Sequence, residues 1–223
     1  MKTRRVLKDY MPLIVPYNKP FSDLSRKEAD YYFKWFLSHI DERAEYLKEM
    51  ICRDLNISKN QLDYTLESTV IIWRWFLSIA RISNTPDGVL KQLRNSLKGY
   101  PESFIAHMVQ QSEDELSIAT EYVLRDIGMY VSKLFIPTYT QLKWEIRYTP
   151  KSYVHVNEPL IVGFIDDDPL YPKPFSPEME PVDLVRTPAM NLFEGTENER
   201  DLFDRCMQWI NWIPGNRRDN LND

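Results

Sequence analysis

Apolar residues recur at three- and four-residue steps through most of the first half of the chain, which is the spacing of amphipathic helices. The clearest pattern covers residues 25–55, where Ser25 and Glu28 have the spacing of a capping box at a helix start. A second helix is predicted over residues 63–82, and its middle is apolar on nearly every side. An extended start and two shorter helices complete this half: residues 1–22, 86–97 and 101–111.

The stretch from Ser112 to Phe164 is the part of the sequence around which we expect the fold to be organised. Ser112 and Glu115 again have capping-box spacing, and the apolar stripe that follows predicts a helix ending before Pro137. Gly128 interrupts this stripe, and a glycine there costs about 1 kcal/mol relative to alanine. The sequence therefore predicts a close neighbour, a kink or a helix end at Gly128.

Beyond this helix the period changes from that of a helix to that of a strand. Apolar and polar residues alternate over residues 142–148, which predicts a strand with one buried face. Residues 153–157 are predicted to pair back on it as a hairpin, and the apolar run 160–165 predicts a strand covered on both faces. We expect a helix laid across a small antiparallel sheet.

Proline and acidic residues then dominate, and no apolar period is visible over residues 166–188. Thr196 and Glu199 predict a third capping box and a closing helix that ends at Pro214. The predicted fold class is α+β, with a mainly helical N-terminal half packed on a small antiparallel sheet and a C-terminal helix. One domain is expected, divided into an extended segment 1–22, a helical part 23–136, a sheet 140–166, a Pro-rich acidic loop 167–195, a closing helix 196–213 and a flexible tail 214–223.

Composition indicates a folded, soluble and cytoplasmic protein. Hydrophobic residues make up 43% of the 223 positions, which is ample for a core. Cys52 and Cys206 lie far apart on predicted helices and are expected to be free thiols of a reducing compartment. The apolar run near the start is broken by prolines and is too short for a signal peptide. No run approaches the about 20 apolar residues of a membrane span.

Charge is distributed unevenly along the chain. Residues 166–205 hold eleven acidic and four basic side chains, a net charge of −7, which leaves +2 for the rest of a chain of net charge −5. Binding of a polyanion depends on basic side chains, so this segment argues against nucleic acid and favours a basic protein as partner. The predicted contact residues are Asp166, Asp167, Asp168, Glu178, Glu180 and Asp183.

No pattern of residues indicates catalysis or a bound cofactor. The glycines form no phosphate-binding loop, no serine stands in a nucleophile elbow, and the three histidines have no zinc-ligand spacing. His155 and Glu158 would face opposite sides of a strand, so no metal site is predicted from them. Asp166, Asp167 and Asp168 are interpreted as a solvated turn.

Two alternatives remain open. Arg74 lies within an apolar helix and is expected either to reach solvent, paired with Glu67 or Glu121, or to hold an anion in a pocket with His155 and Glu158 between the central helix and the sheet. The nearby Trp73 and Trp75 are expected in the core, although a helix that is apolar on all sides is also compatible with a homodimer contact.

Part of the sequence, residues 121–164, resembles a family of small cytoplasmic bacterial proteins that are similar to the immunity proteins of polymorphic toxins. The resemblance rests on Asp126, Gly128, Tyr130, Trp144, Asn157, Pro159, Gly163 and Phe164. It implies an acidic protein that blocks a partner by occlusion and has no catalytic residues. We therefore expect a non-enzymatic protein-binding protein, the alternative being a small hydrolase or ligand-binding protein that uses the pocket.

Overall fold

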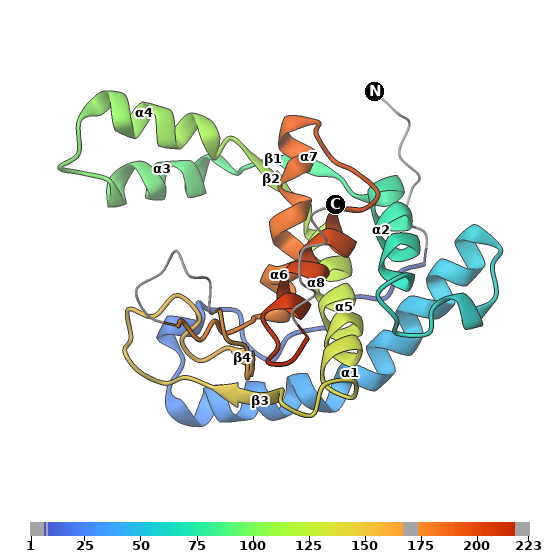
Figure 1. Cartoon of the computed structure of the whole chain (residues 1–223). Coiled ribbons are helices and arrows are strands. Elements are labelled where there is room, and N and C mark those ends of the chain that lie inside the picture. The colour runs from blue at the N-terminus through green and yellow to red at the C-terminus, as the bar shows by residue number, and fades with distance from the viewer. Residues whose placement is uncertain (1–6, 8, 167–173, 217–223) are drawn as a thin grey trace, which may run out of the picture.

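The computed structural model describes residue 7, residues 9–166 and residues 174–216 of the chain. A long helix α1 (Arg26–Leu55) crosses one side of the molecule, and the central helix α5 (Ile118–Phe135) packs against it (Figure 1). The other face of α5 packs against α6 (Pro181–Ala189), and α2 (Ser68–Ile79) and α8 (Asp201–Asn211) close the bundle. Two 3-10 turns (Phe21–Asp23 and Lys59–Gln61) and the short helix α7 (Asn191–Glu194) complete this body.

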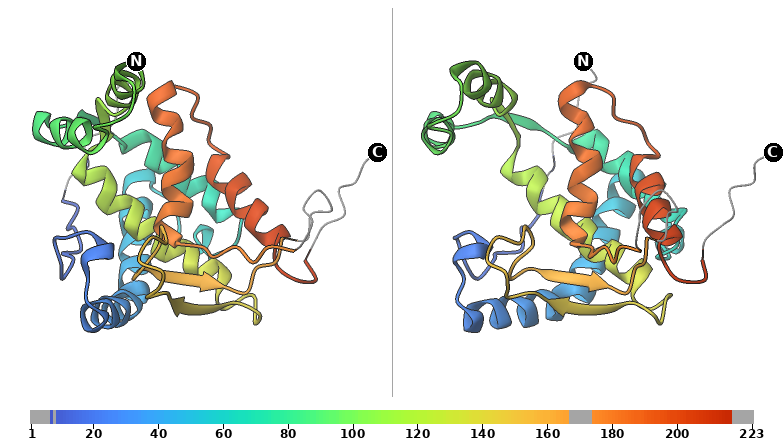
Figure 2. Two further views of the ribbon diagram at one scale, coloured as in Figure 1. Left: turned by 90° about the vertical axis from the view of Figure 1, so that its left-hand side faces the viewer. Right: turned by 60° about the vertical axis from the view of Figure 1, so that its left-hand side comes forward.

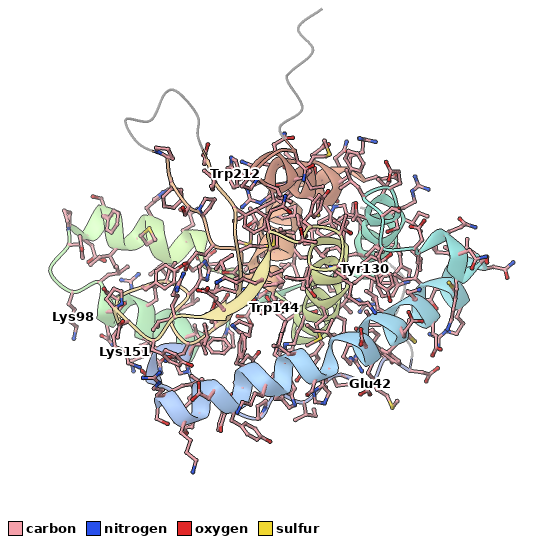
Figure 3. The ribbon with its side chains drawn as sticks, turned by 60° about the horizontal axis from the view of Figure 1, so that its bottom comes forward. Glu42, Lys98, Tyr130, Trp144, Lys151 and Trp212 are labelled. Carbon is pink, nitrogen blue, oxygen red and sulfur yellow. The ribbon has the colours of Figure 1, made fainter. Side chains whose placement is uncertain are left out.

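Two antiparallel pairs of strands accompany the helices, which confirms the α+β class. Strand β3 (Lys143–Ile146) pairs with β4 (Pro159–Val162), with Trp144 opposite Ile161. This ribbon lies beside α1, with Trp144 between them (Figure 3). The rings of Trp144 and Phe36 pack edge to face with their centres 5.9 Å apart. The second pair joins β1 (Ile82–Asn84) to β2 (Asp114–Leu116).

The strands β1 and β2 form the base of a helical hairpin, residues 82–116, that stands away from the body. Its helices are α3 (Asp87–Ser96) and α4 (Glu102–Gln111), and Lys98 lies in the turn that joins them (Figures 2 and 3). Both helices lie close to their predicted ranges. The pairing of β1 with β2 was not predicted.

The apolar stripes that predicted α1 and α2 face a common core. Trp73 and Trp75 are both fully buried inside this chain, so a contact between two copies would have to use other residues. Cys52 and Cys206 are free thiols. Arg43 lies among charged residues of α1 in the sequence, yet it is buried and paired with Asp126.

Helix starts were predicted less well than helix faces. The capping box of Ser25 and Glu28 is confirmed. The one expected at Ser112 is wrong, because residues 114–116 form β2 and Ser117 caps α5 by accepting from the Thr120 amide at 3.3 Å. The cap expected at Thr196 is also wrong, because α8 begins at Asp201, after turns in which Asn198 donates its amide to Asp201.

Two further predictions are corrected between the sheet and α8. Residues 153–157 form consecutive turns and no strand, so β3 pairs with β4. The region predicted as a loop contains α6, whose Pro181 occupies the first helical turn, where a missing amide hydrogen is tolerated. Across the described part of the chain, no helix has the length and apolar character needed to cross a bilayer.

Candidate functional site

A hollow of about 190 Å³ lies where the N-terminal segment, α1, α5, the start of β4 and α6 meet. Tyrosine and apolar side chains form part of its wall, and the charged part consists of Lys19, Arg125, Glu158, Glu180, Asp183 and Arg186. Lys19 is paired with Glu28 at 2.9 Å, and Arg125 donates to the carbonyl of Leu13. The other charged groups of the wall belong to the turn before β4 and to the first two turns of α6.

His155 and Glu158 meet beside this hollow. The chain between Pro150 and β4 runs through turns, with Asn157 in the left-handed region at φ 65° and its side-chain amide donating to the carbonyl of Phe21. This turn places Nδ1 of His155 3.0 Å from Oε2 of Glu158. The prediction that the two side chains face opposite sides of a strand is wrong, because there is no strand at these residues.

The first turn of α6 supplies the opposite side of the cluster. Glu180 caps the helix by accepting from the amide of Asp183 at 2.6 Å, which holds Asp183 beside the turn that carries His155. Oδ2 of Asp183 lies 3.6 Å from Nδ1 of His155. The other oxygen of Asp183 pairs with Arg186, which also pairs with Glu121 of α5 at 2.8 Å.

Burial and neighbouring charge shift the proton affinities of this site. Burial, with the adjacent carboxylates of Asp183 and Glu158, raises the pKa of Glu180 from its ordinary 4.5 to about 8. The hydrogen bond that His155 donates to the carboxylate of Glu158 raises the pKa of the imidazole above its ordinary 6.5. The cluster thus favours positive charge at the imidazole and disfavours a further negative charge at Glu180.

The structure brings together members of two different predicted sets. His155 and Glu158 belonged to the predicted pocket, and Glu180 and Asp183 belonged to the predicted contact surface. Arg74 does not join them: its side chain is 58% exposed and pairs with Glu199 at 2.9 Å, instead of with the predicted Glu67 or Glu121.

The remaining acids of the predicted contact surface lie elsewhere. Glu178 pairs with Arg147 and accepts from the hydroxyl of Tyr153 at 2.7 Å. Asp166 pairs through its backbone with Phe175, and Asp167 and Asp168 lie outside the described residues. Arg186 and Arg125 were missed by sequence reasoning. The only signal for Arg186 was its three-residue spacing from Asp183, which has meaning only once α6 is recognised as a helix.

Chemically, the hollow offers carboxylates, an imidazole and guanidinium groups. No serine, threonine or cysteine lies among the described residues that line it, so the site offers no side-chain nucleophile of these types. Groups of this kind can bind a charged ligand.

The helical hairpin presents a surface of a different kind. No described side chain between Pro86 and Phe104 is buried, and three apolar side chains there are exposed: Val89 at 49%, Tyr100 at 59% and Phe104 at 41%.

Comparisons with protein-family models, with curated proteins and with solved structures find no match to this chain.

Proposed function

We propose that the chain is a non-enzymatic protein-binding protein that contacts its partner through the helical hairpin. The observation that carries this proposal is the exposure of Val89, Tyr100 and Phe104, with the rings of Tyr100 and Phe104 5.2 Å apart. These residues belong to a hairpin that stands apart from the body (Figure 2). Apolar side chains gathered on an exposed surface mark interaction sites, and aromatic residues are enriched at the centres of protein interfaces.

The size of the hairpin supports the same proposal. Two helices of ten residues each are too short to be stable in water by themselves, and helical stability in proteins comes mostly from packing. Among the described residues of α3 and α4, Ile105 is the only apolar residue that is buried. A partner with an apolar groove would cover what the hairpin leaves exposed, as in helix-in-groove recognition.

The predicted acidic contact surface gives less support. Glu178, Glu180 and Asp183 are engaged within the chain and are not free to attract a basic protein. The hairpin, residues 82–116, carries both signs of charge, with five acidic and three basic side chains. We therefore propose a partner with an apolar groove, and the charges of the hairpin do not select the sign of the groove's rim.

Neutralisation of a partner protein by occlusion is the specific form of this function that the resemblance over residues 121–164 implies. In such a role the protein needs no catalytic group and acts by covering a surface. The free thiols of Cys52 and Cys206 agree with action in the cytoplasm, where disulfides are rare.

Site-specific photocrosslinking in the cells that make the protein tests this proposal. A photoreactive phenylalanine analogue at Tyr100 is expected to give one discrete adduct with another protein, which disappears when Phe104 is also changed to serine. Tyr31 of α1 is the matched control, since its exposed fraction of 56% is close to the 59% of Tyr100. Equal crosslinking from both positions, or none from Tyr100, would show that the hairpin is not the contact element.

A further inference from the structure

We infer that His155, Glu158 and Asp183 form a binding site for a divalent transition-metal ion such as Zn²⁺. Each residue offers one ligand atom, and these three atoms lie within 4.8 Å of one another. They come from two segments far apart in sequence, the turn before β4 and the first turn of α6. This inference is independent of the proposed binding of a protein through the hairpin.

The distances between the ligand atoms fit a tetrahedral ion. With ligands at about 2.0–2.1 Å from zinc, tetrahedral geometry places any two ligand atoms about 3.3 Å apart. The measured separations from Nδ1 of His155 are 3.0 Å to Glu158 and 3.6 Å to Asp183, on either side of that value. The carboxylate oxygens of Glu158 and Asp183 lie within 4.8 Å of each other, so side-chain rotations that bring them together would complete the set of three ligands.

Neighbouring groups hold the ligands in place. One oxygen of Asp183 is occupied by Arg186, which leaves Oδ2 directed to the imidazole. The Asp183 backbone is held by the carboxyl of Glu180, a residue that is only 8% exposed and lines the same hollow. Contacts of this second layer orient metal ligands and are typical of built metal sites.

Charge and access also favour a cation. With the imidazole of His155 neutral, as a metal ligand must be, Glu158 and Asp183 together with the ion-paired Arg186 and Glu121 carry a net charge of −2, which one divalent ion would balance. In the described part of the chain no basic side chain pairs with Glu180, which accepts from the backbone amides of Val182 and Asp183. Within those residues, no cation paired with Glu180 therefore opposes a metal ion at the site. The side chains of His155 and Glu158 are 19% and 17% exposed, and the adjoining hollow leaves room for water as a fourth ligand.

The donor set selects the class of metal. One imidazole nitrogen with two carboxylate oxygens suits Zn²⁺ or Mn²⁺, whereas Mg²⁺ prefers oxygen ligands alone. The site is expected to bind Zn²⁺ much more tightly than Mg²⁺.

Calorimetric titration of the chelator-treated full chain with Zn²⁺, and separately with Mg²⁺, tests the inference. One equivalent of Zn²⁺ is expected to bind to the unaltered protein, and His155→Ala and Asp183→Asn are each expected to weaken that binding at least tenfold. His107→Ala, which removes an exposed histidine from α4, is the matched control and is expected to leave the affinity unchanged.

Two outcomes would overturn the metal site. One is the absence of Zn²⁺ binding by the unaltered protein, and the other is binding that His155→Ala and Asp183→Asn weaken no more than His107→Ala does. Should either site variant fail to fold, the visible spectrum of the unaltered protein with Co²⁺ decides the question. A tetrahedral site gives intense visible bands, and a spectrum identical to that of aqueous Co²⁺ would refute the inference.

Discussion

Asp126 is a fully buried carboxylate in the middle of the central helix, and its partner is a guanidinium from another helix. Arg43 of α1 donates Nε to Asp126 at 3.0 Å and a terminal nitrogen to the carbonyl of Met11 at 2.9 Å. Tyr10 donates its hydroxyl to the same carboxylate, and the Arg43 guanidinium lies 4.3 Å from the ring centre of Tyr46. The buried pair of Arg43 and Asp126 therefore connects the N-terminal segment to both α1 and α5 through hydrogen bonds.

Replacing Asp126 by leucine is expected to lower the free energy of unfolding by about 3–5 kcal/mol, because it leaves the charge of Arg43 buried without a partner. Urea denaturation measures the loss. The double variant Arg43→Met with Asp126→Leu removes both charges and is expected to recover most of the stability. Equal instability of the single and double variants would show that the buried charge is not the cause.

The carboxyl group of Glu180 should make the stability of the protein depend on pH. Its pKa is about 8 in the folded protein and 4.5 ordinarily, so the folded state keeps a proton that the unfolded state loses between these values. Stability is therefore expected to fall as pH rises from about 4.5 to about 8, by on the order of a few kcal/mol.

Glu180→Gln removes this titration and retains an oxygen that can cap α6. In the presence of a chelator, the variant and the unaltered protein are expected to be equally stable at pH 4.5, and the variant more stable at pH 8. Thermal unfolding across this range measures the difference. A stability difference that does not change with pH would contradict the assignment.

Sequence patterns predicted burial well where a residue was apolar and poorly where it was charged. The helical period of apolar residues over residues 25–55 includes Tyr32, Phe36, Leu47 and Ile51, and all four face the core. Arg43 lies among charged neighbours in the sequence, and it is buried by Asp126 of α5 together with the path of residues 10–11 over α1. That path depends on contacts between distant segments, which no local period records.

At the scale of elements, the approach of α6 to α5 depends on Gly128. A Cβ atom at this position would lie 2.9 Å from the carbonyl oxygen of Pro181, which is closer than side-chain carbons normally come to backbone. Of the three features predicted for this glycine, the close neighbour is the one the structure shows. The start of α6 also positions Asp183, so the glycine affects the candidate metal site through helix packing.

Gly128→Ala is therefore expected to destabilise the protein by about 1–3 kcal/mol, as inserted methyl groups do in tight cores. Gly88→Ala in α3 is the matched control, because nothing lies within 4 Å of its Cβ position. This control is expected to be neutral or slightly stabilising, since alanine favours a helix over glycine. Denaturation midpoints of the two variants measure the contrast, and similar midpoints would contradict the close approach.

The sequence predicted some residues of the candidate metal site but not the turn and the helix that bring them together. His155 and Glu158 were selected as residues, but the period of the preceding strand suggested that strand structure continued through them. Pro181 and Pro188 made α6 resemble a loop, although one occupies the first helical turn and the other the last. The three ligands come together only because residues 153–157 form a turn and α6 begins at Pro181, and the sequence pattern predicted neither.

At the scale of the whole molecule, the chain consists of a body with a continuous core and a hairpin that contributes little to it. The main cluster of buried side chains includes Ile79, Ala80 and Leu116 but no buried residue between Arg81 and Glu115. The two proposed sites follow this division, because the metal ligands belong to the body and the partner contact belongs to the hairpin.

Removal of the hairpin should therefore separate the two proposed activities. Ser83 and Glu115 are directly paired across β1 and β2, so residues 84–114 can be replaced by Asn-Gly, which favours a two-residue turn between such strands. The free energy of unfolding of the shortened protein is expected to lie within about 1 kcal/mol of that of the full chain, because the deletion removes few buried contacts.

The shortened protein is also expected to bind one equivalent of Zn²⁺ with unchanged affinity and to lose the partner that Tyr100 crosslinks in the full chain, as co-precipitation of that partner would measure. A shortened chain that does not fold would show that the hairpin supports the core, against its exposure. A folded, shortened chain that still binds the same partner would place the contact on the body instead. Because the metal ligands and the exposed aromatic residues lie in different parts, the two measurements can fail separately.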